Sequence, residues 1–351
     1  MDIGQISGND LFMKIAIVLL NYNDAKGTVD ALKRIDGFSC FNDVIVVDNA
    51  SSGNSAEQIE KAVVGSSIHF IKAPKNGGYG YGNNIGVRYA YEKLHDELAV
   101  IANPDAEFDE ALILAMERLF EHKENVGAVG AVMRSHSEKK QKHSRYIELG
   151  AARDSKVPSA QGTMKEQDDH FSYDEYLASG WKRRGFLGSL INSGPVLRRL
   201  FRHSINYPYV HYLGTKPDDN KNDNIEQGLP SACKVYAVHG SLLMVSAAVF
   251  CSLGGYDEGM FLYGEENVLA EKLCRAGFDS YLVNMGYEHA GSVSISGSGH
   301  TAVKRQRFRN ESENYYYRKY LGCSKAELML AKLVQKTVLA ETKLAALLGI
   351  L

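Results

Sequence analysis

The sequence lacks paired cysteines, a surplus of charge of either sign and any long hydrophobic run. Its five cysteines are odd in number and show no Cys-x-x-Cys spacing, which argues against a disulfide framework and a structural zinc site. Lys and Arg total 40 and Asp and Glu total 42, for a net charge of -2, so nucleic acid is not an expected partner. The apolar run IAIVLL (15–20) is too short for a signal core or a membrane span, so we expect a cytoplasmic protein, with peripheral contact to the inner face of a membrane left open.

Three common nucleotide-binding or hydrolase motifs are also absent. Gly80-x-Gly82 is followed by Gly86 rather than by a glycine three positions after Gly82, and Pro74 precedes the glycine segment, so the Rossmann fingerprint fails on spacing. The chain has no G-x-x-x-x-G-K-[ST] loop and no G-x-S-x-G elbow. Dinucleotide-dependent enzymes, P-loop NTPases and serine hydrolases therefore lose support.

Residues 14–133 alternate between β-rich and helical patterns. This alternation predicts an α/β fold with a mostly parallel, Rossmann-like sheet flanked by helices. The continuous apolar character of the strand patterns agrees, because strands covered on both faces have no polar side. We predict strands over 14–20, 43–48, 67–73, 97–102 and 126–133, and helices over 28–35, 55–64, 83–94 and 110–123.

The rest of the chain divides into three parts. Residues 134–232 are polar and aperiodic, which predicts an insertion that shapes an acceptor cleft or forms a lid. Regular secondary-structure patterns return in 233–300, with a Gly-Gly turn, a helix ending near Gly277 and a strand over 278–285. Residues 301–351 read as a C-terminal helical region.

The end of this helical region is amphipathic from Ser324 onward. Lys332, Lys336 and Lys343 fall on one helical face among many leucines. We favour a helix that packs on the core or on a second subunit. A helix lying in a membrane interface is the alternative.

Polar residues follow four successive predicted strands. In an open parallel sheet ligands bind beyond the carboxyl ends of the strands. Each polar group taken alone is explained as well by a turn or a helix cap. Taken together they predict a site for a polar ligand that carries phosphates, and its members are Asn21 and Tyr22, Asp48, Asn76 to Asn84, and Asn103-Pro104-Asp105.

An ordered series of segments resembles the family 2 glycosyltransferases of the GT-A fold, in particular their rhamnosyl- and galactofuranosyltransferase-like members. The resemblance covers 14–133 and 234–320, and NPD (103–105) stands where the family has its Asp-x-Asp motif. It implies a nucleotide-sugar-binding half over 14–133 and an acceptor-side half over 233–300. The matching segments are IVLLNYND, VIVVDNASSGNS, PKNGGYGYGNNIGVRYA, NPD, GSLLMVSAAVFCSLGGYDEGMFLYGEENVLAEKLCRAGF and YEHAGSVS.

The resemblance implies a divalent metal, Mn²⁺ or Mg²⁺, as cofactor. Asp105 and His289 would be its protein ligands, and this mixed set of oxygen and nitrogen suits such ions. Asn103 would take the place of the first carboxylate and bind the ribose or the sugar, while Pro104 holds it in an extended backbone.

The resemblance also implies a catalytic carboxylate. Glu265 and Glu266 open a predicted helix, where the helix dipole favours a carboxylate. The family has Glu-Asp at this place, so Glu266 would be the base that deprotonates the acceptor and Glu265 would orient it. Because Glu is one methylene longer than Asp, Glu265 remains an alternative base.

Donor binding is implied for several strand-end residues. The basic run over 304–309 either neutralises the diphosphate or forms a solvated loop. The implied donor-binding residues are Asn21, Tyr22, Asp48, Asn76, Gly77, Gly78, Asn84, Asn103 and Asp105.

The expected activity is inverting transfer from a nucleoside-diphosphate sugar to a hydroxyl of a saccharide or lipid-linked glycan, in cell-surface polysaccharide synthesis. A dTDP-rhamnose or UDP-hexose donor is favoured, and a homo-oligomer is left open. Two other functions compete. A noncatalytic sugar-nucleotide-binding subunit would need the same donor residues, and a nucleotidyltransferase would need a Gly-rich, Arg-containing loop that LLNYND (19–24) does not provide.

Overall fold

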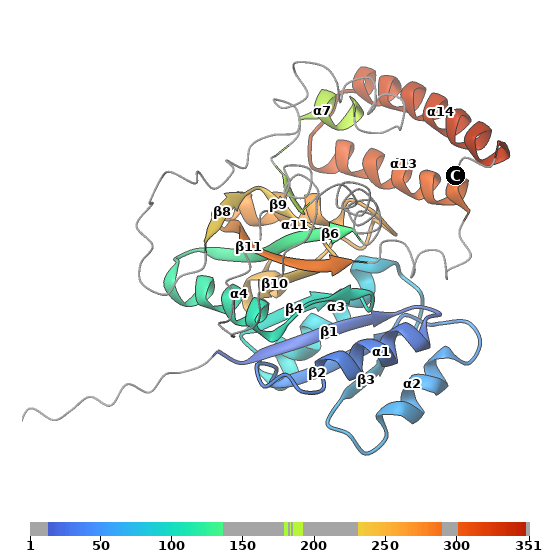
Figure 1. Ribbon diagram of the computed structural model, residues 1–351. Coiled ribbons are helices and arrows are strands. Elements are labelled where there is room, and N and C mark those ends of the chain that lie inside the picture. Colours follow the sequence, from blue (N-terminus) through green and yellow to red (C-terminus); the bar gives the residue numbers. More distant parts are fainter. Residues whose placement is uncertain are drawn as a thin grey trace, which may run out of the picture.

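The computed structural model describes residues 13–135, 179–181, 183, 185–191, 231–289 and 301–348 (Figure 1). Most of the insertion predicted over 134–232 therefore lies outside the described residues. The first half of the fold alternates strands and helices, as predicted. Its elements are β1 Ile15–Asn21, α1 Ala25–Ile35, β2 Asp43–Asp48, α2 Ser55–Val63, β3 His69–Lys72, α3 Tyr79–Tyr89 with the π-helical turn η1 Ala90–Leu94, β4 Leu98–Ala102, β5 Ala106–Glu107, α4 Glu110–His122 and β6 Val126–Ser135.

The second half adds further strands and two long helices. The predicted strand over 278–285 extends to His289, and the C-terminal tail is helical, as expected. The elements are β7 Gly180–Trp181, α7 Phe186–Ile191, β8 Ala232–Val235, β9 Ala237–Val238, β10 Leu242–Ser246, α10 Ala247–Ser252, α11 Glu265–Arg275, β11 Asp279–His289, α13 Ala302–Lys319 and α14 Lys325–Leu347.

A nine-stranded sheet forms the central layer, in the order β3-β2-β1-β4-β10-β6-β11-β5, with β8 paired to β11. Strands β3, β2, β1 and β4 run parallel, as predicted. Beyond β4 the sheet is mixed, because β10 lies antiparallel between β4 and β6. The buried, uniformly apolar run LLMV in β10 fits either direction, so its pattern could not disclose the reversal.

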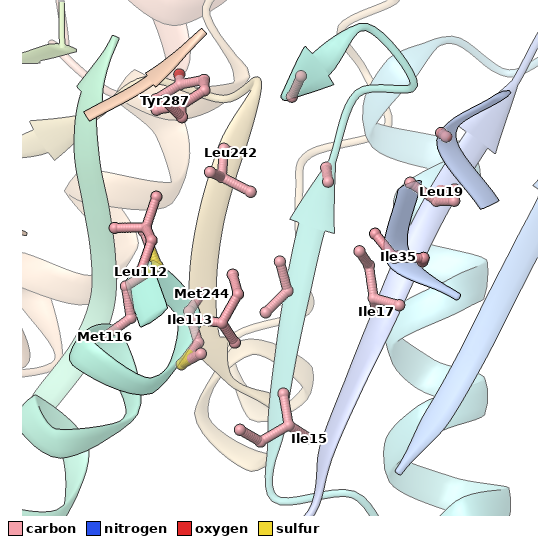
Figure 2. Close-up of a cluster of buried hydrophobic side chains, with 14 of the residues drawn as sticks. Ile15, Ile17, Leu19, Ile35, Leu112, Ile113, Met116, Leu242, Met244 and Tyr287 are labelled. Atoms are coloured by element: carbon pink, nitrogen blue, oxygen red, sulfur yellow. The ribbon is translucent and has the colours of Figure 1, made fainter. Parts of the chain in front are cut away.

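The core lies on both faces of the sheet. Successive side chains of β1 point to opposite faces, so Ile15, Ile17 and Leu19 join one buried cluster while Ala16 and Val18 join another. Figure 2 shows the first cluster, in which α4 packs onto the strands. The side chains labelled there include Leu112, Ile113 and Met116 of α4, Leu242 and Met244 of β10, and Tyr287 of β11.

The C-terminal helices form a separate layer. Helix α13 packs against α14, and α14 lies outermost in Figure 1. A third buried cluster, which includes Tyr317, Ala331 and Met260, joins these helices to the segment before α11. Within the described part of the chain, no helix combines the length and the apolar character needed to cross a membrane.

Candidate active site

A cavity of about 320 Å³ opens beyond the carboxyl ends of β1 and β4. This is where an open parallel sheet binds its ligands. The walls come from both halves of the chain. They are formed by Leu20, Tyr22, Asp24, Asn49, Asn76, Gly78, Tyr79, Asn103, Pro104, His239, Gly240, Ser241, Phe261, Leu262, Tyr263, Gly264, Glu265, Glu266 and His289.

The structure brings most of the predicted site residues to this cavity. Residues from the predicted nucleotide side and from the predicted acceptor side face the same space. Those that line it are Tyr22, Asn76, Gly78, Asn103, Glu265, Glu266 and His289. Five predicted residues do not line it, namely Asn21, Gly77, Asp48, Asn84 and Asp105.

Asn21 and Asp48 lie one layer behind the cavity, at the paired ends of β1 and β2. Both are buried, and Asn21 Nδ2 donates to Asp48 Oδ1 at 2.6 Å. The other carboxylate oxygen accepts from the backbone N–H of Ser51 at 3.0 Å. These bonds fix the strand ends on which the cavity is built, so the contact predicted between these two residues and the nucleotide stays a prediction.

The glycine loop before α3 joins the two walls of the cavity. Gly78 has φ +94, and a Cβ added there would lie 2.1 Å from the carbonyl oxygen of Phe261. Only glycine satisfies both conditions. The N–H of Tyr79 donates to the same Phe261 carbonyl at 3.0 Å, and Asn76 Oδ1 accepts from the N–H of Gly78.

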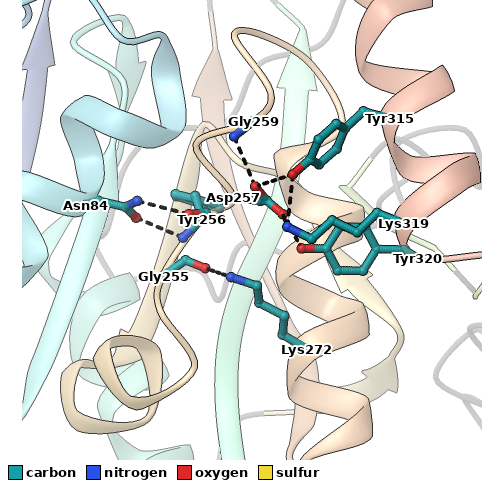
Figure 3. A network of polar contacts seen from close by, with 9 residues as sticks. All are labelled: Asn84, Gly255, Tyr256, Asp257, Gly259, Lys272, Tyr315, Lys319 and Tyr320. Carbon is teal, nitrogen blue, oxygen red and sulfur yellow. Dashed lines mark hydrogen bonds and ion pairs between the residues drawn. The ribbon is translucent and has the colours of Figure 1, made fainter.

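Gly77 and Asn84 serve packing in this structure. A Cβ on Gly77 would lie 2.4 Å from the ring of Tyr81. The Asn84 side chain is buried and bonds both backbone groups of Tyr256, accepting from its N–H at 2.8 Å and donating to its carbonyl at 3.0 Å (Figure 3). Because the Asn84 amide is bonded to the turn at Tyr256, its side chain lies away from the cavity. The donor contact predicted for Asn84 stays a prediction.

Asp105 and His289 lie side by side. The antiparallel pairing of β5 with β11 sets His289 opposite Ala106, next to Asp105. Asp105 Oδ1 lies 3.2 Å from His289 Nε2 but has no hydrogen-bond partner among the described residues. Asn103 Nδ2 is 3.4 Å from the same imidazole nitrogen.

This donor set fits a divalent cation. A buried carboxylate oxygen without a hydrogen-bond partner, 3.2 Å from the imidazole nitrogen of a cavity residue, is a donor pair suitable for Mn²⁺ or Mg²⁺. Among the described residues no group of three or more His, Cys, Asp or Glu side chains could hold a metal. Two protein ligands suffice where substrate phosphates and water complete the coordination, as is usual for Mg²⁺.

The two glutamates occupy different environments at the start of α11. Glu265 is buried, and its burial, followed by the charge of Glu266, raises its pKa to about 8. Burial also raises the pKa of Glu266, while backbone hydrogen bonds and the charge of Arg309 act in the opposite direction. Gly240 makes room for this second carboxylate, because a Cβ there would lie 2.9 Å from Glu266 Oε1.

His239 is a cavity residue that the sequence analysis missed. Its ring centroid lies 5.9 Å from that of His289. Burial, and secondarily the neighbouring His289, lower its pKa to about 4, so its imidazole is neutral at pH 7. The only signal was its position directly before Gly240, where the family resemblance begins.

The basic run over 304–309 lies at the start of α13 and is helical, so the alternative of a loop is wrong. Arg309 stacks 4.8 Å from the ring centroid of Tyr263, and Phe308 lies 4.8 Å from Phe261. Because Tyr263 and Phe261 line the cavity, this helix supports the acceptor-side wall. Arg309 is the member of the run placed near Glu266.

Asp257 ties the same wall to the far end of α13 (Figure 3). Its carboxylate accepts from Lys319 Nζ at 2.6 Å, from the Tyr315 hydroxyl at 3.0 Å and from the Tyr320 hydroxyl. It also accepts from the N–H of Gly259 at 3.0 Å. The turn before the cavity segment 261–264 is thus anchored from one side by α13 and from the other by Asn84.

Part of the sequence matches known proteins. Residues 16–179 match a family model described as glycosyl transferase family 2. Over 95 residues the chain is 33% identical to the low-salt glycan biosynthesis hexosyltransferase Agl10 of Haloferax volcanii, which is 27% of this chain and 29% of that protein. The match therefore spans less than a third of the curated relative.

Comparison with solved structures finds likeness in fold to GalNAc-T7 at low sequence identity. GalNAc-T7, solved with UDP, GalNAc and Mn²⁺, superposes with a TM-score of 0.51 at 11% identity, over 88% of this chain and 50% of that one. The mannosyltransferase PcManGT from Pyrobaculum calidifontis, solved with GDP-Man and Mn²⁺, gives a TM-score of 0.49 at 14% identity, over 96% of this chain and 79% of that one. Over residues 16–179 the chain is therefore similar to glycosyl transferase family 2, and it has the GT-A fold.

Proposed function

We propose that the protein is an inverting glycosyltransferase that moves a sugar from a nucleoside-diphosphate sugar to a hydroxyl of a saccharide or lipid-linked glycan. One observation carries the proposal. The Glu266 carboxylate and the group formed by Asn103 and His289 face the same cavity. A base for the acceptor and a binding site for the leaving diphosphate can therefore act on one sugar carbon.

Glu266 is the base in this reaction. The acceptor oxygen forms a bond to the anomeric carbon as the bond to the phosphate oxygen breaks, and the acceptor proton passes to Glu266. A base with a raised pKa accepts that proton more readily than an ordinary carboxylate, and burial raises the pKa of Glu266. Glu265, with a pKa of about 8, is mostly protonated at pH 7 and donates a hydrogen bond that orients the acceptor.

The diphosphate side is held by Asn103, Asp105 and His289. Asp105 and His289 would bind a divalent cation, Mn²⁺ or Mg²⁺, whose charge neutralises the leaving diphosphate. Asn103 faces the cavity and binds the ribose or the sugar. The Mn²⁺ and UDP named for GalNAc-T7 support this choice of cofactor and ligand class.

The donor base would lie against Tyr22 and Asn76, which line the cavity and belong to the predicted nucleotide-binding half. Asn21, Asp48, Gly77, Gly78 and Asn84 shape the loops around it. We favour dTDP-rhamnose or a UDP-hexose as donor, by resemblance to rhamnosyl- and galactofuranosyltransferase-like enzymes. Agl10 is a hexosyltransferase of glycan biosynthesis, and the similarity to it supports a role in cell-surface polysaccharide synthesis.

A panel of nucleotide sugars with Mn²⁺ or Mg²⁺, scored by release of nucleoside diphosphate, tests the proposal. We expect metal-dependent release from one donor, abolished in Asp105→Ala and in Glu266→Gln. Glu57→Gln, at an exposed position on α2, is the matched control and should match the wild type. Release that a chelator leaves unchanged would contradict the metal site. Donor binding without turnover across a wide acceptor panel would favour the noncatalytic subunit, and pyrophosphate release from a nucleoside triphosphate would favour the nucleotidyltransferase.

A further inference from the structure

Helix α14 has an inner face that packs in the ordinary way. Its buried residues, Ala331, Gln335, Val338 and Thr342, recur every three or four positions, which is the spacing of one helical face. Gln335 donates to Glu313 and accepts from Asn314, both on α13. The favoured prediction, a helix packed on the core, is therefore confirmed for this face.

The outer face of α14 is apolar and exposed. Met329, Leu333 and Leu347 are 72%, 64% and 84% exposed, and Leu344 lies beside them. At about 100° per residue these four side chains fall within about 60° of one another and form one stripe along the helix. We call these four residues the outer stripe. Leu330 and Leu348 are exposed at its edge.

Exposed large hydrophobic residues concentrate on this helix. Six of the ten that the described part of the chain exposes lie between 329 and 348. The other four, Val64, Tyr91, Leu114 and Leu187, lie on separate elements. Single exposed hydrophobic residues need no explanation, whereas several on one face of one helix mark a surface that contacts a partner.

Lysines border the outer stripe on one side. Lys325, Lys332, Lys336 and Lys343 are all exposed, and on a helical projection they fall between about 20° and 60° from Met329 on the same side. No ion pair to them is found within the described residues. The two acidic residues of the helix, Glu327 and Glu341, project about 120° or more from Met329 and leave the stripe free of negative charge.

We propose that the outer stripe and the lysines that border it bind an anionic lipid surface. A helix with exposed leucines and a lysine flank lies in the bilayer interface, with its apolar side chains among the acyl chains and its lysines at the anionic headgroups. Because no described helix can cross a membrane, α14 would lie on the surface rather than span it.

The charge pattern favours lipid over a second copy of the chain. If two copies paired their outer stripes antiparallel, the lysine flank of one helix would face the lysine flank of the other, as equivalent flanks do in antiparallel helix pairs. Like charges in that arrangement repel. An anionic bilayer instead complements the whole flank at once. This inference does not depend on the proposed reaction.

Sedimentation of the full chain with lipid vesicles tests the inference. We expect binding to vesicles of mixed phosphatidylcholine and phosphatidylglycerol, weakened by salt, and much less binding to phosphatidylcholine alone. Leu333→Glu should lower the partition coefficient at least about tenfold, and replacing Lys332, Lys336 and Lys343 by Gln should lower it about fivefold for each lysine. Val64→Glu is the matched control, because Val64 is 77% exposed on another part of the surface.

Thermal melts of both Glu variants, expected to match the wild type at these exposed positions, would show that folding is intact. Equal loss of binding in Val64→Glu, or equal binding to neutral and anionic vesicles, would overturn the proposal. Sedimentation equilibrium measures whether the protein forms a dimer through this helix. A wild-type dimer that Leu333→Glu dissociates, with no vesicle binding, would show that a second copy covers the stripe and would also overturn it.

Discussion

The nucleotide-side wall of the cavity is backed by polar side chains that bond to one another, whereas the acceptor-side wall itself has buried titratable groups. Behind the first wall Asn21 and Asp48 are joined directly and anchor the loop at Ser51. On the second wall Glu265 Oε1 has no hydrogen-bond partner among the described residues, and burial raises the pKa of its carboxyl. A bonded layer behind a wall lets the wall bind a ligand without rearranging, while perturbed groups are typical of proton transfer.

Both walls have residues at positive φ, Asn23 and Ala50 on the nucleotide side and Tyr263 on the acceptor side, but only Tyr263 is bulky. Directly before Glu265, Tyr263 has φ +75 and Gly264 has φ +85. A bulky residue at positive φ is strained and persists only where its surroundings hold it. Arg309, stacked on the Tyr263 ring, and the Asp257 network on α13 provide that support. The acceptor-side wall is thus built by tertiary contacts, and the predictions below test this contrast.

The largest expected effect is on the acceptor-side wall. Glu266→Gln should lower kcat about 10³-fold, in the range that a general base contributes, with little change in donor binding. Glu265→Gln should lower it less than about tenfold, because Gln resembles the protonated acid that a pKa of about 8 implies at pH 7. Steady-state kinetics and nucleotide titration measure both.

The dependence of kcat on pH sharpens this comparison. Because burial raises the pKa of Glu266, activity should fall on the acid side at a higher pH than for an ordinary carboxylate. A larger loss in Glu265→Gln than in Glu266→Gln would move the base to Glu265, the alternative that the sequence left open.

The second prediction concerns the polar layer behind the nucleotide-side wall. Asp48→Ala removes the carboxylate that accepts from the buried Asn21 amide and from the Ser51 N–H, and leaves the amide only the hydroxyls of Ser51 and Ser55. The free energy of unfolding should therefore fall by about 3 kcal/mol. Urea denaturation measures this loss, and KM for the donor should rise more than kcat falls. Asp30→Ala, which removes an exposed ion pair with Lys26, should leave the free energy of unfolding nearly unchanged. Equal losses in the two variants would contradict the idea of a preformed wall.

The sequence predicted the nucleotide-side half of the fold well because its signals are local. Continuous apolar runs gave β1, β2 and β4, and strand ends gave Asn21, Asp48 and Asn103. These local signals could not show which of the predicted residues line the cavity and which support it from behind. Asn21 and Asp48 lie behind the cavity, and Asn84 bonds to Tyr256, which is distant in the chain.

The acceptor-side wall was harder to predict because it is assembled from distant segments. His239 comes to His289 only through the pairing of β10 and β11 with their neighbours. Arg309 reaches Tyr263 through helix docking. The family resemblance pointed to Glu266 and His289 as site residues. Periodicity and spacing alone could not have done so, because they do not show which side of a helix faces a cavity.

The third prediction concerns the support of the acceptor-side wall. Asp257→Asn weakens the bonds from Lys319, Tyr320 and Tyr315, so the free energy of unfolding at pH 7 should fall by about 2 kcal/mol. Although burial alone would raise it, the bonds from Lys319 and Tyr320 hold the pKa of Asp257 well below its usual value. A lowered pKa contributes stability above the unfolded value of 3.8 that is lost as pH falls below it.

Urea denaturation of wild type and Asp257→Asn at several pH values should therefore show a difference that shrinks in acid. A positioning role also predicts a lower kcat with an unchanged KM for the donor. A uniform loss of stability at every pH, with unchanged kcat, would show that the network merely holds α13 in place.

The smallest expected effect lies away from both walls, at Asp96. This side chain is buried, with no hydrogen-bond partner for either oxygen among the described residues. Burial, and then the charge of Asp43, raise its pKa from 3.8 to about 7. A raised pKa means that ionisation costs the folded state free energy, a cost that is absent near pH 4 and grows as pH rises to about 7. Asp96→Asn, which cannot ionise, should match the wild type near pH 4 and become more stable than it as the pH rises to 8, as measured by urea denaturation. Asp36→Asn, at an exposed position on the surface, should show no such trend. A variant that is less stable than the wild type at every pH would mean that Asp96 is a structural acceptor and not a strained acid.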